Sequence, residues 1–271
     1  MIFAPRSCPS RPGFAITTRI FPATVSQYMS VKLTVVGCSP AWPNPGGAQS
    51  GYLVEGPGRL LLDCGPGVLA RLREENGWPR VDAIVVSHFH LDHWGDLVPW
   101  VWGTMAGPGR EKPQPLLWLP PGGARRLREL GSRLGFEEMF ERTFELHRYD
   151  EGTAFEAAEG LTVTAMRLPH YTLQTYGFRV SNGQRTLAYS GDSGPSDRLA
   201  ELARDADLFL CEATLERGEL DGLPRGHLAA DEAVAAFEAS GARRLLITHR
   251  PHELPLDGKL EQAFDGLELE V

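Results

Sequence analysis

The sequence VDAIVVSHFHLDH, residues 81–93, determines how the rest of the chain can be interpreted. Its first six residues are mostly β-branched or aliphatic, and so short a run is typical of a buried strand rather than a helix. His88 and His90 follow two residues apart. On extended backbone both imidazoles project to one side, and Phe89 and Leu91 are then expected to point toward the core.

The two residues that follow extend this cluster. Asp92 and His93 come at once, and because Asp commonly begins a helix, a turn of the backbone there can aim both side chains at a second point nearby. Three imidazoles and one carboxylate beside a buried strand would be costly to bury without a partner. Nitrogen and oxygen ligands in this pattern favour a transition metal, with zinc as the first choice and manganese as an alternative.

Residues 87–93, Ser-His-Phe-His-Leu-Asp-His, resemble the His-x-His-x-Asp-His signature of the metallo-β-lactamase superfamily. The resemblance implies an α/β fold, the αββα sandwich, in which two mixed sheets are flanked by helices. It also implies a site for two divalent metal ions along one edge of the sandwich. One such motif cannot complete a two-metal site, so further ligands are expected at the ends of other strands.

Three further candidate ligands follow predicted strands. His170 comes after a strand predicted at residues 161–168, Asp192 after one at 185–190, and His249 after one at 245–248. Each has an ordinary alternative, because the histidines could lie on the surface and Asp192 could belong to a turn. Their shared position after strands favours metal binding. The resemblance implies one metal at His88, His90 and His170, the other at Asp92, His93 and His249, and a bridge at Asp192.

Two more residues could supply the proton that a departing alkoxide needs. Glu212 follows a strand predicted at residues 207–211, and His227 precedes a helix predicted at 229–239. We expect His227 to act as general acid or to stabilise charge in the transition state, and Glu212 to orient it. The alternative is that Glu212 forms a local cap or salt bridge and His227 only begins the helix. With Asp92, these two are the expected catalytic residues.

The loops around Glu212 and His227 resemble those of the phosphodiesterase branch of the superfamily, which includes ribonuclease Z and cyclic-nucleotide phosphodiesterases. Ribonuclease Z usually has His-Ser-Thr where this chain has His227-Leu228-Ala229, and it carries a long tRNA-gripping arm between the counterparts of His170 and Asp192. Here that interval is short. The chain looks most like the armless, atypical class II cyclic-nucleotide phosphodiesterases of actinobacterial type, which implies hydrolysis of a 3′,5′-cyclic nucleotide to the 5′-monophosphate.

Three alternatives stay open at this stage. The chain could be an endonuclease of the ribonuclease Z kind that acts on RNA 3′ ends. It could keep the fold and cleave a thioester or a lactam, in which case His227 and Glu212 have no required role. It could also be a non-catalytic protein that a metal stabilises, although seven ligands with an open water position are typical of catalytic rather than closed structural sites.

The composition limits the partners. A chain of 271 residues with 42% hydrophobic and 23% charged residues is that of an ordinary globular protein, and it contains no apolar run of membrane-spanning length. The net charge of −8 counts against nucleic acid as a partner, because such binding rests on Lys and Arg neutralising phosphates. A small phosphodiester is the expected substrate, no membrane partner is expected, and the family resemblance suggests a homodimer.

The cysteines and the first residues bear on compartment and domain limits. Cys8, Cys38, Cys64 and Cys211 form no CxxC pair or disulfide framework, which favours a reducing, cytoplasmic setting. Residues 1–30 are rich in Pro, Ser and Arg, lack acidic residues and lack a secretory apolar segment, so we expect a flexible or non-native extension. Residues 31–271 are then expected to form a single domain.

The remaining pattern predicts strands and helices along the whole domain. Further strands are predicted at residues 31–37, 50–54, 59–63, 116–119, 143–149 and 175–181, and helices at 66–75, 94–105 and 123–134. Asn182-Gly183 predicts a hairpin turn between two of the strands. We expect the consecutive strands that begin at residue 143 to form the second sheet.

Overall fold

The computed structural model of the chain describes residues 30–74 and 77–271. The predicted extension at residues 1–30 therefore lies outside the described residues, except for its last residue, and Cys8 lies outside them as well. Cys38, Cys64 and Cys211 are buried free thiols, as the absence of a disulfide framework predicts.

The first sheet has seven strands in the order β13-β1-β2-β3-β4-β5-β6. The strands from β13 to β3 pair antiparallel, and those from β3 to β6 pair parallel. Leucine, isoleucine and valine fill its central strands, which are buried on both faces. Their bounds are β1 (Lys32–Gly37), β2 (Gly51–Glu55), β3 (Arg59–Leu62), β4 (Ala83–Val85), β5 (Leu116–Leu119), β6 (Glu145–Arg148) and β13 (Glu268–Glu270).

The second sheet has six strands in the order β12-β11-β10-β9-β8-β7. It is also mixed, because β10, β11 and β12 run parallel whereas β7, β8, β9 and β10 pair antiparallel. As predicted, a turn at Asn182-Gly183 joins β9 to β10, and the Asn182 side chain accepts hydrogen bonds from the backbone of Gln184 and Arg185. The bounds are β7 (Ala154–Ala158), β8 (Leu161–His170), β9 (Leu173–Ser181), β10 (Thr186–Tyr189), β11 (Leu208–Glu212) and β12 (Leu245–Thr248).

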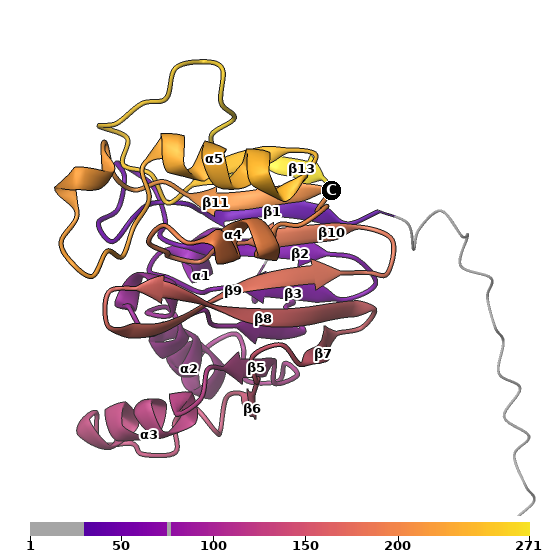
Figure 1. Cartoon of the computed structure of the whole chain (residues 1–271). Helices are drawn as coiled ribbons and strands as arrows, with labels where there is room; N and C mark the ends of the chain where they lie inside the picture. The colour runs from indigo at the N-terminus through magenta and orange to yellow at the C-terminus, as the bar shows by residue number, and fades with distance from the viewer. Residues whose placement is uncertain (1–29, 75–76) are drawn as a thin grey trace, which may run out of the picture.

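Helices cover the outer face of each sheet and complete the predicted αββα sandwich (Figure 1). Three of them, α1 (Val68–Leu72), α2 (Leu97–Ala106) and α3 (Gly123–Arg133), lie on the side of the first sheet. On the other side, α4 (Asp197–Leu202) and α5 (Ala230–Ser240) pack against the second sheet. The helices in residues 30–74 and 77–271 are all too short or too polar to traverse a bilayer.

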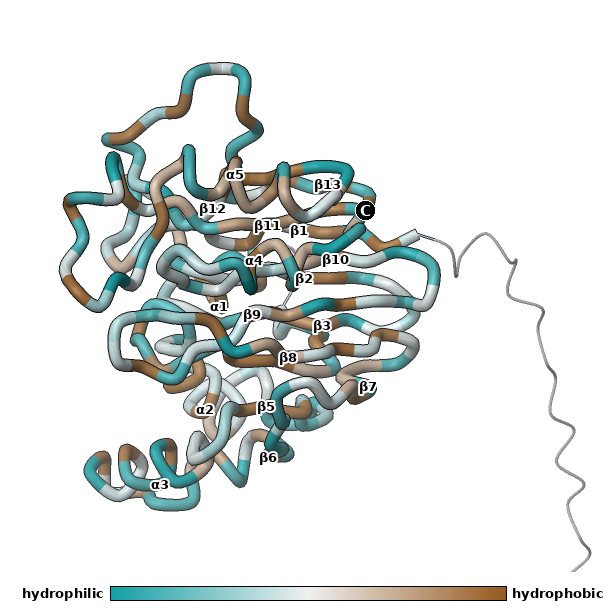
Figure 2. The backbone as a smooth tube through the Cα atoms, viewed as in Figure 1, coloured by the Kyte–Doolittle hydropathy of each residue, from teal (hydrophilic) through white to brown (hydrophobic). Residues whose placement is uncertain are grey.

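The largest apolar cluster lies between the two sheets and includes Leu60 and Val85 from the first and Phe178 and Leu210 from the second. Figure 2 shows hydrophobic stretches along the strands and a largely hydrophilic α3. On α3 the Arg-rich side is exposed and Leu127 is buried, which is the amphipathic surface helix that the sequence predicts.

The structure corrects several element assignments. The strand predicted at residues 143–149 is β6, which pairs with β5 at the edge of the first sheet rather than beginning the second. The second sheet begins with β7, whose Ala and Glu residues carry little strand signal. The helix predicted from residue 94 begins at Leu97. Both α4 and β13, which are short, were not predicted.

Strand direction explains where the candidate residues gather. The carboxyl ends of β3 and β4 meet at one edge of the first sheet, and those of β8, β10, β11 and β12 meet at the corresponding edge of the second. Polar residues that follow these strands therefore meet at one edge of the sandwich, as in other sheets whose sites lie at carboxyl ends of strands.

Candidate metal centre

The structure brings the seven predicted ligands into two adjoining groups. Within each group the potential ligand atoms all lie within 4.8 Å of one another. The groups share Asp192 and have the division that the resemblance implied: His88, His90, His170 and Asp192 in the first, and Asp92, His93, His249 and Asp192 in the second. All of these residues except His90 are buried.

The two carboxylate oxygens of Asp192 face different groups. Oδ2 lies 3.6 Å from Nε2 of His88 and 3.8 Å from Nε2 of His170. Oδ1 lies 3.2 Å from Nε2 of His93 and 3.5 Å from Nε2 of His249. A carboxylate in this orientation can hold two cations at a fixed separation.

Unsatisfied buried atoms provide a test of whether a cation fits here. Nε2 of His88, Nε2 of His93 and Oδ1 of Asp192 are buried and make no hydrogen bond with any other described residue. A buried polar atom without a partner is unfavourable, and few are expected in a folded protein. All three point into the same cluster of nitrogen and oxygen donors, so the residues present fit divalent metal ions.

The opposite ring nitrogen of each of four histidines is held by a hydrogen bond. Such bonds fix the tautomer and ring orientation of metal-binding histidines. The partners of Nδ1 are Oγ of Ser87 for His88 at 3.0 Å, the carbonyl of Gly226 for His170 at 2.6 Å, Oγ1 of Thr214 for His249 at 2.9 Å, and Oδ2 of Asp63 for His93 at 2.7 Å. Nε2 of each of these four histidines then faces the other donor atoms of the cluster, where it could bind a metal ion.

Asp63 is a functional candidate that the sequence analysis did not identify. It is fully buried at the end of β3, with a positive φ of 59°, and it also accepts hydrogen bonds from Ser87 and the Tyr189 hydroxyl. Its signal in the sequence was an aspartate directly after three leucines, at the end of a predicted strand, much as Asp192 lies near the end of another.

Burial and neighbouring charges set the protonation of the cluster. Burial lowers the pKa of His88, His90 and His170, which keeps these rings neutral, as metal ligands must be. Burial would also lower the pKa of His93, but three surrounding carboxylates, Asp192, Asp63 and Asp92, raise it well above the ordinary value. A cation at this point would therefore replace a proton.

The structure around the motif differs from the prediction in two respects. His90 is extended, but Leu91–His93 form a 3₁₀ turn, so Asp92 lies inside that turn and does not begin α2. Phe89 packs against the core as expected, whereas the Leu91 side chain is 61% exposed. The turn reverses the chain after His90, which directs Asp92 and His93 into the site and Leu91 outward.

Glu212 and His227 form the predicted pair. Nδ1 of His227 donates to Oε1 of Glu212 at 2.9 Å, and Glu212 is fully buried. Burial alone would lower the pKa of His227, but the charge and hydrogen bond of Glu212 raise it to about 9. His227 also belongs with Glu212 and His249 to a group of donor atoms within 4.8 Å of one another, which places it beside the second metal group.

Thr214 links this pair to the metal cluster. Its hydroxyl donates to Oε2 of Glu212 at 2.9 Å and accepts from Nδ1 of His249. The remaining Glu212 contacts are the backbone amides of Ser193 and Thr214. One buried carboxylate therefore fixes His227 directly and His249 through a single hydroxyl.

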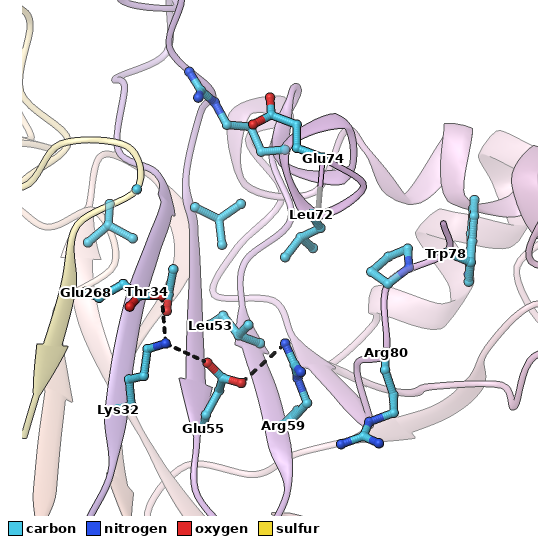
Figure 3. Close-up of a pocket in the computed structure, with 15 residues that line it drawn as sticks. Lys32, Thr34, Leu53, Glu55, Arg59, Leu72, Glu74, Trp78, Arg80 and Glu268 are labelled. Atoms are coloured by element: carbon cyan, nitrogen blue, oxygen red, sulfur yellow. Dashed lines mark ion pairs between the residues drawn. The ribbon is translucent and has the colours of Figure 1, made fainter. Parts of the chain in front are cut away.

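Other polar features lie away from this edge. A cavity of about 620 Å³ opens on the outer face of the first sheet, where Lys32, Glu55 and Arg59 stand at the end of the strands opposite to the histidines (Figure 3). These three side chains pair with one another, with distances of 3.8 Å between Lys32 and Glu55 and 3.3 Å between Arg59 and Glu55. His147 and His252 pair with surface glutamates and take no part in the site.

Comparisons with known proteins agree with this geometry. Residues 58–250 match the family described as "Beta-lactamase superfamily domain". In the sequence comparison, the probable metallo-hydrolase YhfI of Bacillus subtilis is 31% identical over 82% of this chain and 88% of its own. In the structural comparison, the crystal structure of YhfI superposes with a TM-score of 0.76 and 25% identity, and the match covers 89% of this chain and all of that one. The uncharacterized protein Rv1339 of Mycobacterium tuberculosis is 34% identical over 88% of each chain. Ribonuclease Z of Mycobacterium bovis is 27% identical over 81% of this chain and 85% of its own.

Proposed function

Because the chain belongs to the β-lactamase superfamily, we propose that it is a metal-dependent hydrolase that uses two divalent ions to cleave a small phosphodiester. The most specific form of the proposal is hydrolysis of a 3′,5′-cyclic nucleotide to the 5′-monophosphate. The observation that carries it is the pair formed by buried Glu212 and partly buried His227, beside two donor groups that share Asp192.

We assign His88, His90 and His170 to one metal and Asp92, His93 and His249 to the other, with Asp192 between them. Five imidazoles and two carboxylates favour zinc, and manganese is the alternative. Two such ions, when bound, supply a hydroxide near neutral pH and accept the charge of phosphoryl oxygens. The protein positions these donors in advance through Asp63, Ser87, Thr214 and the Gly226 carbonyl.

His227 is proposed as the proton donor. Nδ1 is bonded to Glu212, so Nε2 is the nitrogen that can serve the substrate. As water adds to phosphorus and the bond from phosphorus to the 3′ oxygen breaks, His227 gives its proton to that oxygen, and the products are a free hydroxyl and a monophosphate. Glu212 keeps the imidazole protonated until this step, and the pair can contribute roughly 10²–10⁴ in rate.

The preference for a small substrate rests on chain length and charge. The segment between His170 and Asp192 holds only β9 and β10 with their turns, which leaves no room for a long RNA-binding arm. The net charge of −8 disfavours a polyanion. A cyclic nucleotide presents one phosphodiester and needs neither feature.

The direct test is metal content by plasma mass spectrometry, together with hydrolysis of bis-p-nitrophenyl phosphate and cyclic AMP by the same sample. Two metals per chain and turnover of both substrates would support the full proposal. Two metals without turnover of any phosphodiester would contradict it and would favour a thioester or lactam as the bond cleaved.

Endonuclease activity on RNA is the second candidate, because ribonuclease Z is among the relatives. Under this alternative the chain would cleave a precursor tRNA at its 3′ end at physiological salt. Cleavage of that RNA at a rate above the turnover of cyclic AMP would replace the first proposal with this one.

A further inference from the structure

Tyr171 joins the strand that carries His170 to the loop that carries His227. It follows the last residue of β8 and has a φ of 48°, a left-handed conformation that is uncommon for a residue with a large side chain. Its backbone amide donates to the carbonyl of Arg225 at 3.2 Å. Such strain persists only where surrounding contacts enforce it, and it often marks a functional position.

The hydroxyl of Tyr171 reaches the same loop through Asp221. It donates to Oδ1 of Asp221 at 3.0 Å. Oδ2 of Asp221 accepts from the backbone amides of Gly226 at 2.7 Å and His227 at 3.0 Å. One carboxylate therefore connects the tyrosine to the backbone of the proposed proton donor.

The ring of Tyr171 packs against both histidines, whose own rings contact each other at a centroid distance of 4.9 Å. Its centroid lies 4.9 Å from that of His170 and 5.6 Å from that of His227, edge-on to the latter at 79°. A β-carbon at Gly226 would lie 2.3 Å from the ring, so glycine is required there. A shift of the Tyr171 ring would therefore disturb its contacts with both His170 and His227.

The loop has a second support that does not involve Tyr171. Arg225 binds both carboxylate oxygens of Glu232 on α5 at 2.6 and 2.7 Å and donates to the carbonyl of His227 at 3.1 Å. Loss of the Tyr171 hydroxyl alone is therefore expected to shift the loop rather than unfold it.

From this arrangement we propose that Tyr171, acting through Asp221, is a positioning residue that sets where His227 stands relative to the metal cluster. The inference rests on the proposed function, because it requires His227 to deliver a proton. Proton transfer depends steeply on placement, and a displacement of about 1 Å can cost roughly a hundredfold in rate. Neither the superfamily motif nor the predicted ligand set includes this tyrosine.

The test compares Tyr171→Phe with His227→Ala on methyl aryl phosphodiesters whose leaving groups range from 4-nitrophenol to phenol. Phenolate leaves poorly and needs the proton, whereas 4-nitrophenolate needs it far less. We expect Tyr171→Phe to lower kcat about tenfold with phenol and less than about threefold with 4-nitrophenol, because its effect passes through proton delivery. In the His227→Ala background the same substitution should change neither rate.

Two further variants make the result unambiguous. Tyr176→Phe is the matched control, because its hydroxyl bonds Gln174 and not the loop; it should behave as wild type. Asp221→Asn should reproduce the leaving-group dependence of Tyr171→Phe. Metal content and melting temperature are measured for every variant, and a purely structural effect would lower kcat equally for all leaving groups.

Failure of the proposed proton donor and failure of the inference about Tyr171 give different results. If His227→Ala shows no dependence on the leaving group, the proposed proton donor is wrong. If His227→Ala shows that dependence while Tyr171→Phe and Asp221→Asn match wild type, the proton donor stands and the inference about Tyr171 is overturned.

Discussion

Nδ1 of His93 lies 2.7 Å from Oδ2 of Asp63, and both side chains are fully buried. This pair connects the carboxyl ends of β3 and β4, and the same carboxylate holds Ser87, the residue before the histidine motif. The contact fixes the His93 tautomer with Nε2 toward Asp192, so the bond reaches the proposed metal site without Asp63 being a ligand.

Asp63→Asn should therefore weaken metal binding without abolishing it. The amide keeps the volume but loses the charge that orients and strengthens His93, and the expected loss of affinity is about 10–100-fold. Competition with a fluorescent zinc chelator measures this change. Asp82→Asn is the control, because Asp82 bonds the backbone of Arg59 at the opposite end of the same strands. Equal affinity in both variants would contradict a supporting role for Asp63.

Asp192→Asn tests the bridge. An amide offers one neutral oxygen in place of two charged ones, so we expect loss of at least one metal per chain and a loss of activity of at least a hundredfold. Plasma mass spectrometry measures the metal content and the hydrolysis assay measures the activity of the same sample. Asp150→Asn, a change at an exposed surface carboxylate, should leave both unchanged. Two tightly held metals in Asp192→Asn would rule out the assignment of the bridge.

His227→Ala separates proton transfer from binding. The ring is not among the proposed ligands, so the variant should retain two metals, while kcat falls by roughly 10²–10⁴ with little change in KM. Steady-state kinetics with cyclic AMP measure the two parameters. A rise in KM alone would mean that His227 binds substrate, and unchanged activity would favour the thioester or lactam alternative.

Metal removal should destabilise the fold. Without cations, Nε2 of His88 and His93 and Oδ1 of Asp192 stay buried without hydrogen bonds among the described residues. A ligand at 100 times its Kd adds about 2.7 kcal/mol of stability, or roughly 5–10 °C in Tm for a domain of this size. Calorimetry before and after chelation measures this, with re-added zinc as the control. An unchanged Tm would mean that the site is not occupied by a tightly bound metal.

The sequence could place the predicted ligands together because each lies at or just after the end of a strand, and strands of one direction end at one edge of a sheet. The motif at residues 88–93 marked the edge, and His170, Asp192 and His249 followed by the same rule. The division into two groups came from the family resemblance. The structure then brought the seven residues together as that resemblance implied.

The supporting residues could not be found in this way. The role of Asp63 depends on the parallel pairing of β3 with β4, which brings together residues 30 positions apart. The assignment of β6 to the wrong sheet has the same cause, since a strand's partners are set by tertiary packing. Nothing local signals the left-handed backbone of Tyr171, because glycine is the residue that usually marks such a conformation.

The Glu212–His227 contact predicts the pH dependence of kcat. The active form of a general acid is protonated, so kcat should be full below the pKa of His227 and fall as pH rises through it. Glu212 raises that pKa to about 9, and Glu212→Gln removes the charge responsible. Bound cations would lower the pKa of His227 in both proteins, so the two kcat profiles are compared with each other. The fall in kcat at alkaline pH should begin at a lower pH in Glu212→Gln than in the unsubstituted protein. The kcat profile with cyclic AMP from pH 5 to 10 tests this, and a fall that is unmoved by the substitution would show that another group limits the alkaline rate.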